Sequence, residues 1–306
     1  MFETDLGKRM LPIALLFAAS MPYGACFSMN RFAAEDGIPY LPYVFLYTAF
    51  GTVMLLAACA VFRQWPRLTR DHIMVYLSIG AFGLAIPYCV FMIAATRLPS
   101  GIVSIGLTLS PLLTYVWAML LRMDRFNLVR VGGILAGIAA VLLILIPEAS
   151  LPEEGMGGWV LFVLLGPLSF SLASIGAAYF QPTEARPLEI ATGVMVAGTL
   201  MLALVVAAVG DWWFFPNGLN IGGWAVLISA AINAYFFVMF QIIIRKAGPV
   251  VFSSNNFVTT LASAVWGIII FSEHHSAYVW GAIALMCIGL FLVTRPVAPV
   301  KSQSAA

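Results

Sequence analysis

Residues 131–147 read VGGILAGIAAVLLILIP, a run without one charged or hydrogen-bonding side chain. The 306-residue chain is 62% hydrophobic and 9% charged, against roughly 25% charged in soluble domains. Its mean hydropathy is +1.00, so most of its surface must face lipid. A membrane-spanning barrel needs alternating polar residues, which this run lacks, whereas a helix satisfies its own backbone hydrogen bonds. The sequence predicts an all-α integral membrane protein.

Ten apolar runs of about 20 residues are long enough to span a bilayer. Their approximate limits are 10–32, 40–62, 73–97, 99–121, 127–147, 158–181, 188–210, 222–245, 250–272 and 277–295. The first run is too long for the apolar core of a signal peptide. Ten spans place both termini on one side, together with thirteen of the fifteen Lys and Arg residues. The positive-inside rule makes that side cytoplasmic.

The two halves of the sequence match each other at a shift of 149 residues. The matched positions include residues 116–117 with 265–266, Asp124 with Glu273 and, at a shift of 147, residues 51–55 with 198–202. Five spans is an odd number, so the second unit enters the membrane from the opposite side. The predicted architecture is therefore two inverted-topology repeats of five helices, a common plan of secondary transporters. The repeats cover residues 1–149 and 150–298, and residues 299–306 form a short cytoplasmic tail.

With this layout the chain resembles the EamA family of the drug/metabolite transporter superfamily. The family has a proline-containing fourth span, a Gly-Glu-Arg-like turn and a glycine-rich fifth span. The matching residues are 109–111 (Leu-Ser-Pro), 122–125 (Arg-Met-Asp-Arg) and Gly132-Gly133, then 272–274 (Ser-Glu-His) and Gly281. Asp124 replaces the usual glutamate, and Thr260 stands where a second proline is common. The resemblance implies a bacterial inner-membrane exporter or permease for a small metabolite.

A substrate site in such a transporter is expected near the midplane, between the repeats. Polar residues near span centres are concentrated in the first, third, fourth, sixth, eighth and ninth spans, which are therefore expected to line the cavity, while the fifth and tenth brace its outside. The substrate-binding candidates are Ser20, Tyr23, Tyr88, Ser110, Ser171, Ser174, Asn233, Thr259 and Thr260. Asn255, Asn256 and Gln241 lie nearer the cytoplasmic end, as for a vestibule or gate. The alternative is that Ser and Thr hydroxyls bond only to neighbouring backbone.

No charged residue or histidine occupies the centre of a predicted span. An anionic cargo would need Lys or Arg there, so a neutral or zwitterionic metabolite such as an amino acid is expected. The same absence leaves a proton, the candidate coupling ion, without an obvious carrier. No catalytic or metal-ligand set is apparent, so we expect a transporter with no cofactor, no metal and no enzymatic activity. A net charge of +2 argues against nucleic-acid binding.

Asp124 and Glu273 occupy matching positions at opposite faces. They are candidate gate residues, and the alternative is that they only cap helix ends. The expected function is secondary transport, as an exporter working by alternating access. A facilitative, channel-like permease without ion coupling is the alternative. The sequence is compatible with a monomer or a homodimer.

Overall fold

The computed structural model describes residues 5–95, 109–145, 157–180, 182, 184–215, 218–272 and 277–294. Within these ranges the chain is helical and contains no strand, as expected. The elements are α1 (Asp5–Glu35), α2 (Tyr40–Phe62), α3 (Arg70–Gly80), the π-helical η1 (Ala81–Ala85), α4 (Ile86–Ala95), α6 (Ser110–Leu120), α7 (Leu128–Leu145), α8 (Gly157–Val163), α9 (Leu165–Tyr179), α10 (Pro187–Val209), α11 (Ile221–Ala247), α12 (Pro249–Ser253), α13 (Asn255–Phe271) and α14 (Ala277–Thr294).

Seven helical segments in the described ranges are long and apolar enough to cross a membrane. They are Met10–Glu35, Tyr40–Phe62, Arg70–Phe91, Leu161–Tyr179, Pro187–Val209, Ile221–Ala247 and Pro249–Phe271. The predicted fourth, fifth and tenth spans appear there as shorter apolar helices, at Ser110–Leu120, Leu128–Ala140 and Trp280–Val293. Each of these three lies close to residues outside the described ranges, so the structure supports seven spans and the ten-span count stays a prediction.

Local sequence signals set several of the helix ends. The Asn220 side chain accepts a hydrogen bond of 3.0 Å from the Gly223 amide and so caps the first turn of α11. Gly210 ends α10 with φ at 76°, a left-handed conformation that glycine adopts without strain. Gly248 ends α11 at φ 83°, and Pro249 begins α12 directly after it.

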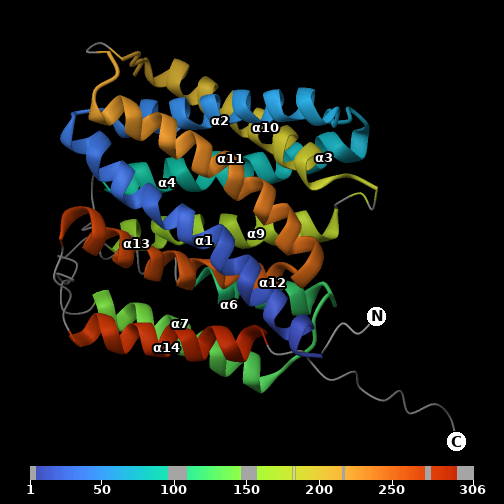
Figure 1. Cartoon of the computed structure of the whole chain (residues 1–306). Coiled ribbons are helices and arrows are strands. Elements are labelled where there is room, and N and C mark those ends of the chain that lie inside the picture. Colours follow the sequence, from blue (N-terminus) through green and yellow to red (C-terminus); the bar gives the residue numbers. More distant parts are fainter. Residues whose placement is uncertain are drawn as a thin grey trace, which may run out of the picture.

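The packing of the helices repeats when the two halves are exchanged. Helix α1 of the first half packs against α11 and α13 of the second half. Helix α9, which takes the place of α1 in the second half, packs against α3, α4 and α6 of the first half. Helix α2 contacts α11 as α10 contacts α3, and the matched helices α2 and α10 also pack against each other. Helices α7 and α14 form a second matched pair, which Figure 1 shows side by side at one edge of the bundle, away from α2 and α10.

Residues at equivalent positions of the two halves, and small residues, lie at these contacts. Thr52 and Thr199, equivalent at the shift of 147, meet with their hydroxyl oxygens 2.9 Å apart. A Cβ atom at Gly133 of α7 would lie 2.8 Å from the Gly289 carbonyl oxygen of α14, and one at Gly289 would lie 2.7 Å from the Gly133 oxygen. Two backbones therefore touch here, as small residues allow in membrane helices.

Two prolines remove backbone donors, and hydroxyl groups from other helices replace them. Pro22 has no N–H to offer the Ala18 carbonyl one turn earlier, and the Tyr235 hydroxyl donates to that carbonyl at 3.2 Å. In η1 the Ile86 amide bonds to the Ala81 carbonyl, five residues back. Pro87 cannot make the next such bond, and Ser169 donates to the Phe82 carbonyl at 2.7 Å. Both bonds join helices of different halves.

Candidate functional site

A pocket lies between the two halves of the molecule and holds about 590 Å³ of unfilled space, including its open mouth. It is bounded by α1, α3, η1, α4, α6, α9, α11, α12 and α13, which together occupy the six spans expected to line a cavity. The lining residues are Tyr23, Ile79, Gly83, Tyr88, Ser110, Phe170, Ala173, Ser174, Phe236, Phe237, Phe240, Phe252, Ser253, Asn255 and Asn256.

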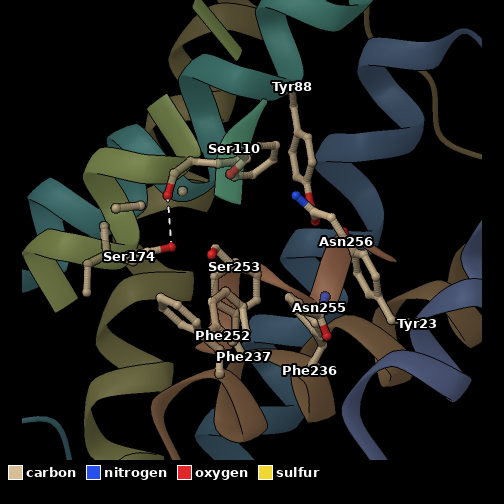
Figure 2. Close-up of a pocket in the computed structure, with 15 residues that line it drawn as sticks. Tyr23, Tyr88, Ser110, Ser174, Phe236, Phe237, Phe252, Ser253, Asn255 and Asn256 are labelled. Atoms are coloured by element: carbon tan, nitrogen blue, oxygen red, sulfur yellow. Dashed lines mark hydrogen bonds between the residues drawn. The ribbon is translucent and has the colours of Figure 1, made fainter. Parts of the chain in front are cut away.

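The lining is aromatic and uncharged. Seven of the fifteen described lining residues are Phe or Tyr, five are Ser or Asn, and none is charged. Broad apolar walls with a few convergent polar groups are typical of small-molecule sites. The polar groups lie on different sides of the space, since Figure 2 shows Ser174 across the pocket from Tyr23 and Tyr88.

Tyr23 and Tyr88 were predicted as binding residues, and both reach the pocket. Their hydroxyl oxygens lie 3.2 Å apart, so one donates to the other. The Tyr23 ring also stacks on Phe236, with ring centroids 4.0 Å apart and planes 20° from parallel. The pair joins α1 to α4 and fixes both rings in orientation. Ser110 and Ser174 are the other two predicted residues that line the pocket.

Ser20 and Thr259 were also predicted to bind substrate, but they are not among the lining residues. The Ser20 hydroxyl donates to Asn255 Oδ1 at 2.5 Å, and Asn255 Nδ2 donates to the Thr259 hydroxyl at 3.1 Å. All three side chains are buried. Ser20 and Thr259 therefore hold the Asn255 amide in one orientation at the wall of the pocket.

Ser171, Thr260 and Asn233, three more predicted binding residues, lie outside the lining. The two hydroxyls bond to their own helices, Ser171 to the Leu168 carbonyl at 2.7 Å and Thr260 to the Asn256 carbonyl at 2.8 Å. The buried Asn233 amide nitrogen donates to the Ser229 carbonyl of its own helix at 2.9 Å and lies 3.8 Å from Cys26 Sγ of α1, while its oxygen has no partner among the described residues. The hydroxyls of Ser171 and Thr260 thus bond to nearby backbone, as in the alternative stated for Ser and Thr.

Of the two predicted gate residues, Asp124 bonds to residues close to it in the sequence, in its own turn and at the start of α7. It forms an ion pair with Arg130 and accepts a hydrogen bond of 2.8 Å from the Arg125 amide. The Tyr115 hydroxyl holds the same turn by donating to the Arg125 carbonyl at 2.9 Å. Glu273 lies outside the described residues.

Two other carboxylates join the halves near the helix ends. Asp36, after α1, accepts a hydrogen bond from the Gly222 amide at the start of α11. Glu189, on α10, lies 3.8 Å from the Arg67 guanidinium before α3 and has a side chain only 6% exposed. Helix α2 runs between the Asp36 connection and the Arg67 connection, so the two contacts lie at opposite ends of the bundle.

The sequence did not single out these carboxylates or the pocket phenylalanines. A phenylalanine in an apolar span is usually explained by packing in the protein core. The sequence therefore did not distinguish the pocket residues Phe170, Phe236, Phe237, Phe240 and Phe252 from other apolar residues. Asn255 and Asn256 were assigned to a vestibule or gate, and they lie in the pocket wall. The sequence feature that could have placed them in the pocket is the presence of two adjacent carboxamides in an apolar run, because each carboxamide needs hydrogen-bond partners.

Comparison with known proteins confirms the family resemblance. Residues 10–146 match the model of the EamA-like transporter family. The first half of the chain is thus similar to an EamA-like domain. The match covers nearly all of the first predicted repeat, whose helices supply Tyr23, Tyr88 and Ser110 to the pocket. The family is one of multi-pass membrane transporters, and its members are not enzymes.

Two similar proteins extend over more of the chain. A WAT1-related chloroplastic protein of Arabidopsis thaliana is 24% identical over 269 residues, which cover 82% of this chain. The aligned region is 63% of that relative's length. A solved crystal structure, 16% identical, matches with a TM-score of 0.76 and covers 94% of this chain and 99% of its own. The match to the solved structure shows that the fold of nearly the whole chain has a counterpart among solved structures.

Proposed function

We propose that this protein is a secondary transporter working by alternating access, with ten spans in two inverted repeats at residues 1–149 and 150–298. The repeated packing supports it, since the largest contacts between the halves have counterparts when the halves are exchanged. Inverted repeats can exchange conformations, which makes the inward-open and outward-open states similar in energy. The pocket lies where such an exchange would expose it first to one side and then to the other.

The cargo is a small neutral or zwitterionic metabolite, and the direction of transport is export. The observation that carries this proposal is a pocket between the halves with aromatic walls, several polar side chains and no charged group among its described lining residues. An anion or a phosphorylated compound would lose its hydration without gaining a counter-charge, which is costly in a site of low dielectric constant.

The protein lies in a bacterial inner membrane with both termini in the cytoplasm. The supporting observation is the distribution of Lys and Arg, with only Arg31 and Arg97 on the opposite side in the ten-span topology. The lipid bilayer and the small-molecule cargo are its partners, and it works as a monomer or a homodimer.

The gates are the contacts that join the halves, Asp36 with the start of α11 and Glu189 with Arg67. One of them must break in each open state, whereas a contact within one turn need not. The local ion pair of Asp124 with Arg130 favours the capping role over the gating role predicted for Asp124.

A thermal-shift screen of the detergent-solubilised protein against amino acids, amines and nucleobases would find ligands, because a bound ligand raises apparent stability by mass action. A compound that stabilises the protein should then be taken up by proteoliposomes. Tyr88→Ala should abolish that uptake, because Tyr88 lines the pocket. Tyr179→Ala is the matched control, since Tyr179 lies at the exposed end of α9. Equal uptake by both variants would contradict the proposal.

The alternative function is a facilitative permease without ion coupling. It is favoured by the absence of Asp, Glu and His from the described lining residues, since a proton relay normally uses such a group. Uptake measured with and without a pH gradient and a membrane potential separates the two. Proton-coupled transport would respond to the gradients, and a facilitative permease would respond to neither.

A further inference from the structure

Two adjacent asparagines at the start of α13 face the pocket in different ways. The Asn255 amide is buried, with Ser20 on its oxygen and Thr259 on its nitrogen. The Asn256 side chain is half-buried and makes no hydrogen bond to any residue that the structure describes, although its backbone carbonyl accepts from Thr260. Figure 2 shows Asn256 on the same side of the pocket as Tyr23 and Tyr88.

The Asn256 amide is open to the pocket. A carboxamide presents an N–H donor and a C=O acceptor side by side. The Asn256 side chain is half-buried at the pocket wall, so water in the pocket can satisfy both groups until a ligand with a matching edge takes its place. The Asn256 amide can therefore offer a bound molecule both a donor and an acceptor, whereas the Asn255 amide already has protein partners.

We propose that Asn256 determines substrate specificity and that the substrate is an uncharged, planar ring compound bearing a donor and an acceptor side by side, as in a carboxamide or a lactam. This inference rests on the proposed function and narrows its neutral or zwitterionic cargo to a neutral one. The ring packs among the phenylalanines, and its polar edge forms two hydrogen bonds to Asn256. Amide-to-edge pairing of this kind is how asparagine recognises a base.

Charge explains why the neutral class is preferred over the zwitterionic one. A zwitterion brings an ammonium and a carboxylate into the site, and each needs a counter-charge or several oriented dipoles. The described lining residues offer hydroxyls and two amides but no charged group. An uncharged donor–acceptor edge loses far less hydration on entry and finds both partners in one side chain.

The experiment measures binding to the full-length protein in detergent by titration calorimetry. The probes are nicotinamide, N,N-dimethylnicotinamide and nicotinate, which share one ring and differ only at the edge. We expect nicotinamide to bind at least roughly tenfold more tightly than the dimethyl compound, which lacks the donor, and than the anion, which carries a charge. Asn256→Ala should bind nicotinamide and the dimethyl compound equally. Asn256→Leu, which keeps a side chain of similar size but has neither a donor nor an acceptor, should also lose the preference for nicotinamide.

Folding of each variant is checked by its thermal unfolding, and Tyr179→Ala serves as a folded control that should keep the preference. Tighter binding of nicotinate, or a preference for nicotinamide that survives in folded Asn256→Ala, would overturn the inference. So would binding of phenylalanine at least as tight as that of nicotinamide. Those results leave the proposed function standing if any solute crosses proteoliposomes, whereas transport of no solute at all would contradict the proposed function itself.

Discussion

At the scale of single residues, the pocket depends in part on side chains that do not line it. Ser20 and Asn255 are separated by 235 positions in the sequence, and together they fix one amide of the pocket wall. The sequence identified Ser20 as a polar residue near the centre of its span, but no periodicity in the first span can show that its partner lies in the ninth. Spacing along one helix predicts which residues share a face and leaves the facing helix unknown.

Ser20→Ala should therefore lower the free energy of unfolding by about 1–3 kcal/mol, since it leaves Asn255 Oδ1 buried without its donor. Ser171→Ala is the matched control. Ser171 is equally buried, but its hydroxyl bonds only to the Leu168 carbonyl of its own helix, so its loss should change stability little. Unfolding in detergent measures both variants. Equal losses would show that Asn255 does not depend on Ser20.

At the scale of elements, hydrophobicity located the helices well and their irregularities poorly. The runs predicted at 40–62, 188–210 and 222–245 agree closely with α2, α10 and α11. The π-helical turn η1 was not predicted, although Pro87 lies two residues after its end. A proline shows that one donor is missing, but which helix supplies a substitute depends on packing. Here Ser169 of α9 supplies it to the Phe82 carbonyl.

This arrangement predicts a coupling between Ser169 and Pro87. Ser169→Ala alone should cost about 1–3 kcal/mol of stability, because the Phe82 carbonyl loses its donor. In a Pro87→Ala background the restored backbone N–H can serve that carbonyl, so the same change should cost close to nothing. A double-mutant cycle of unfolding free energies measures the difference. Additive losses would contradict the assignment of Ser169 as the replacement donor.

At the scale of the whole molecule, the two halves are held together at opposite ends by carboxylates. The matched residues found in the sequence predicted that the halves would correspond, and the contact of Thr52 with Thr199 joins one such pair. The sequence pointed instead to Asp124 and Glu273 as gates, since they match each other at one shift. A match between repeats shows equivalent positions, but it does not show which positions touch the other half.

Cys59 provides a reporter for the contact at one end. It is fully buried, and its sulfur lies 3.2 Å from the Thr192 hydroxyl, one turn along α10 from Glu189. In a background with the other three cysteines replaced by alanine, Glu189→Gln should weaken the contact with Arg67 and speed maleimide labelling of Cys59. We expect a change of roughly tenfold or less, because the Arg67 side chain is 47% exposed and partly screened.

The control is Glu184→Gln. Glu184 also pairs with Arg67, at 3.7 Å, but its side chain is 85% exposed, and such surface pairs contribute little. Its labelling rate should stay close to that of the background protein. If both variants label at the background rate, the contact of Glu189 with Arg67 does not hold this end closed.

The central claim is that the pocket opens to each side in turn, and labelling of Ser174→Cys in a background without native cysteines tests it most directly. Ser174 lines the pocket, and a membrane-impermeant thiol reagent should reach the new cysteine from either face of oriented vesicles. A disulfide between Asp36→Cys and Gly222→Cys should then stop labelling from that end, while labelling from the other face continues. Labelling from both faces with the disulfide formed, or from neither face without it, would contradict alternating access.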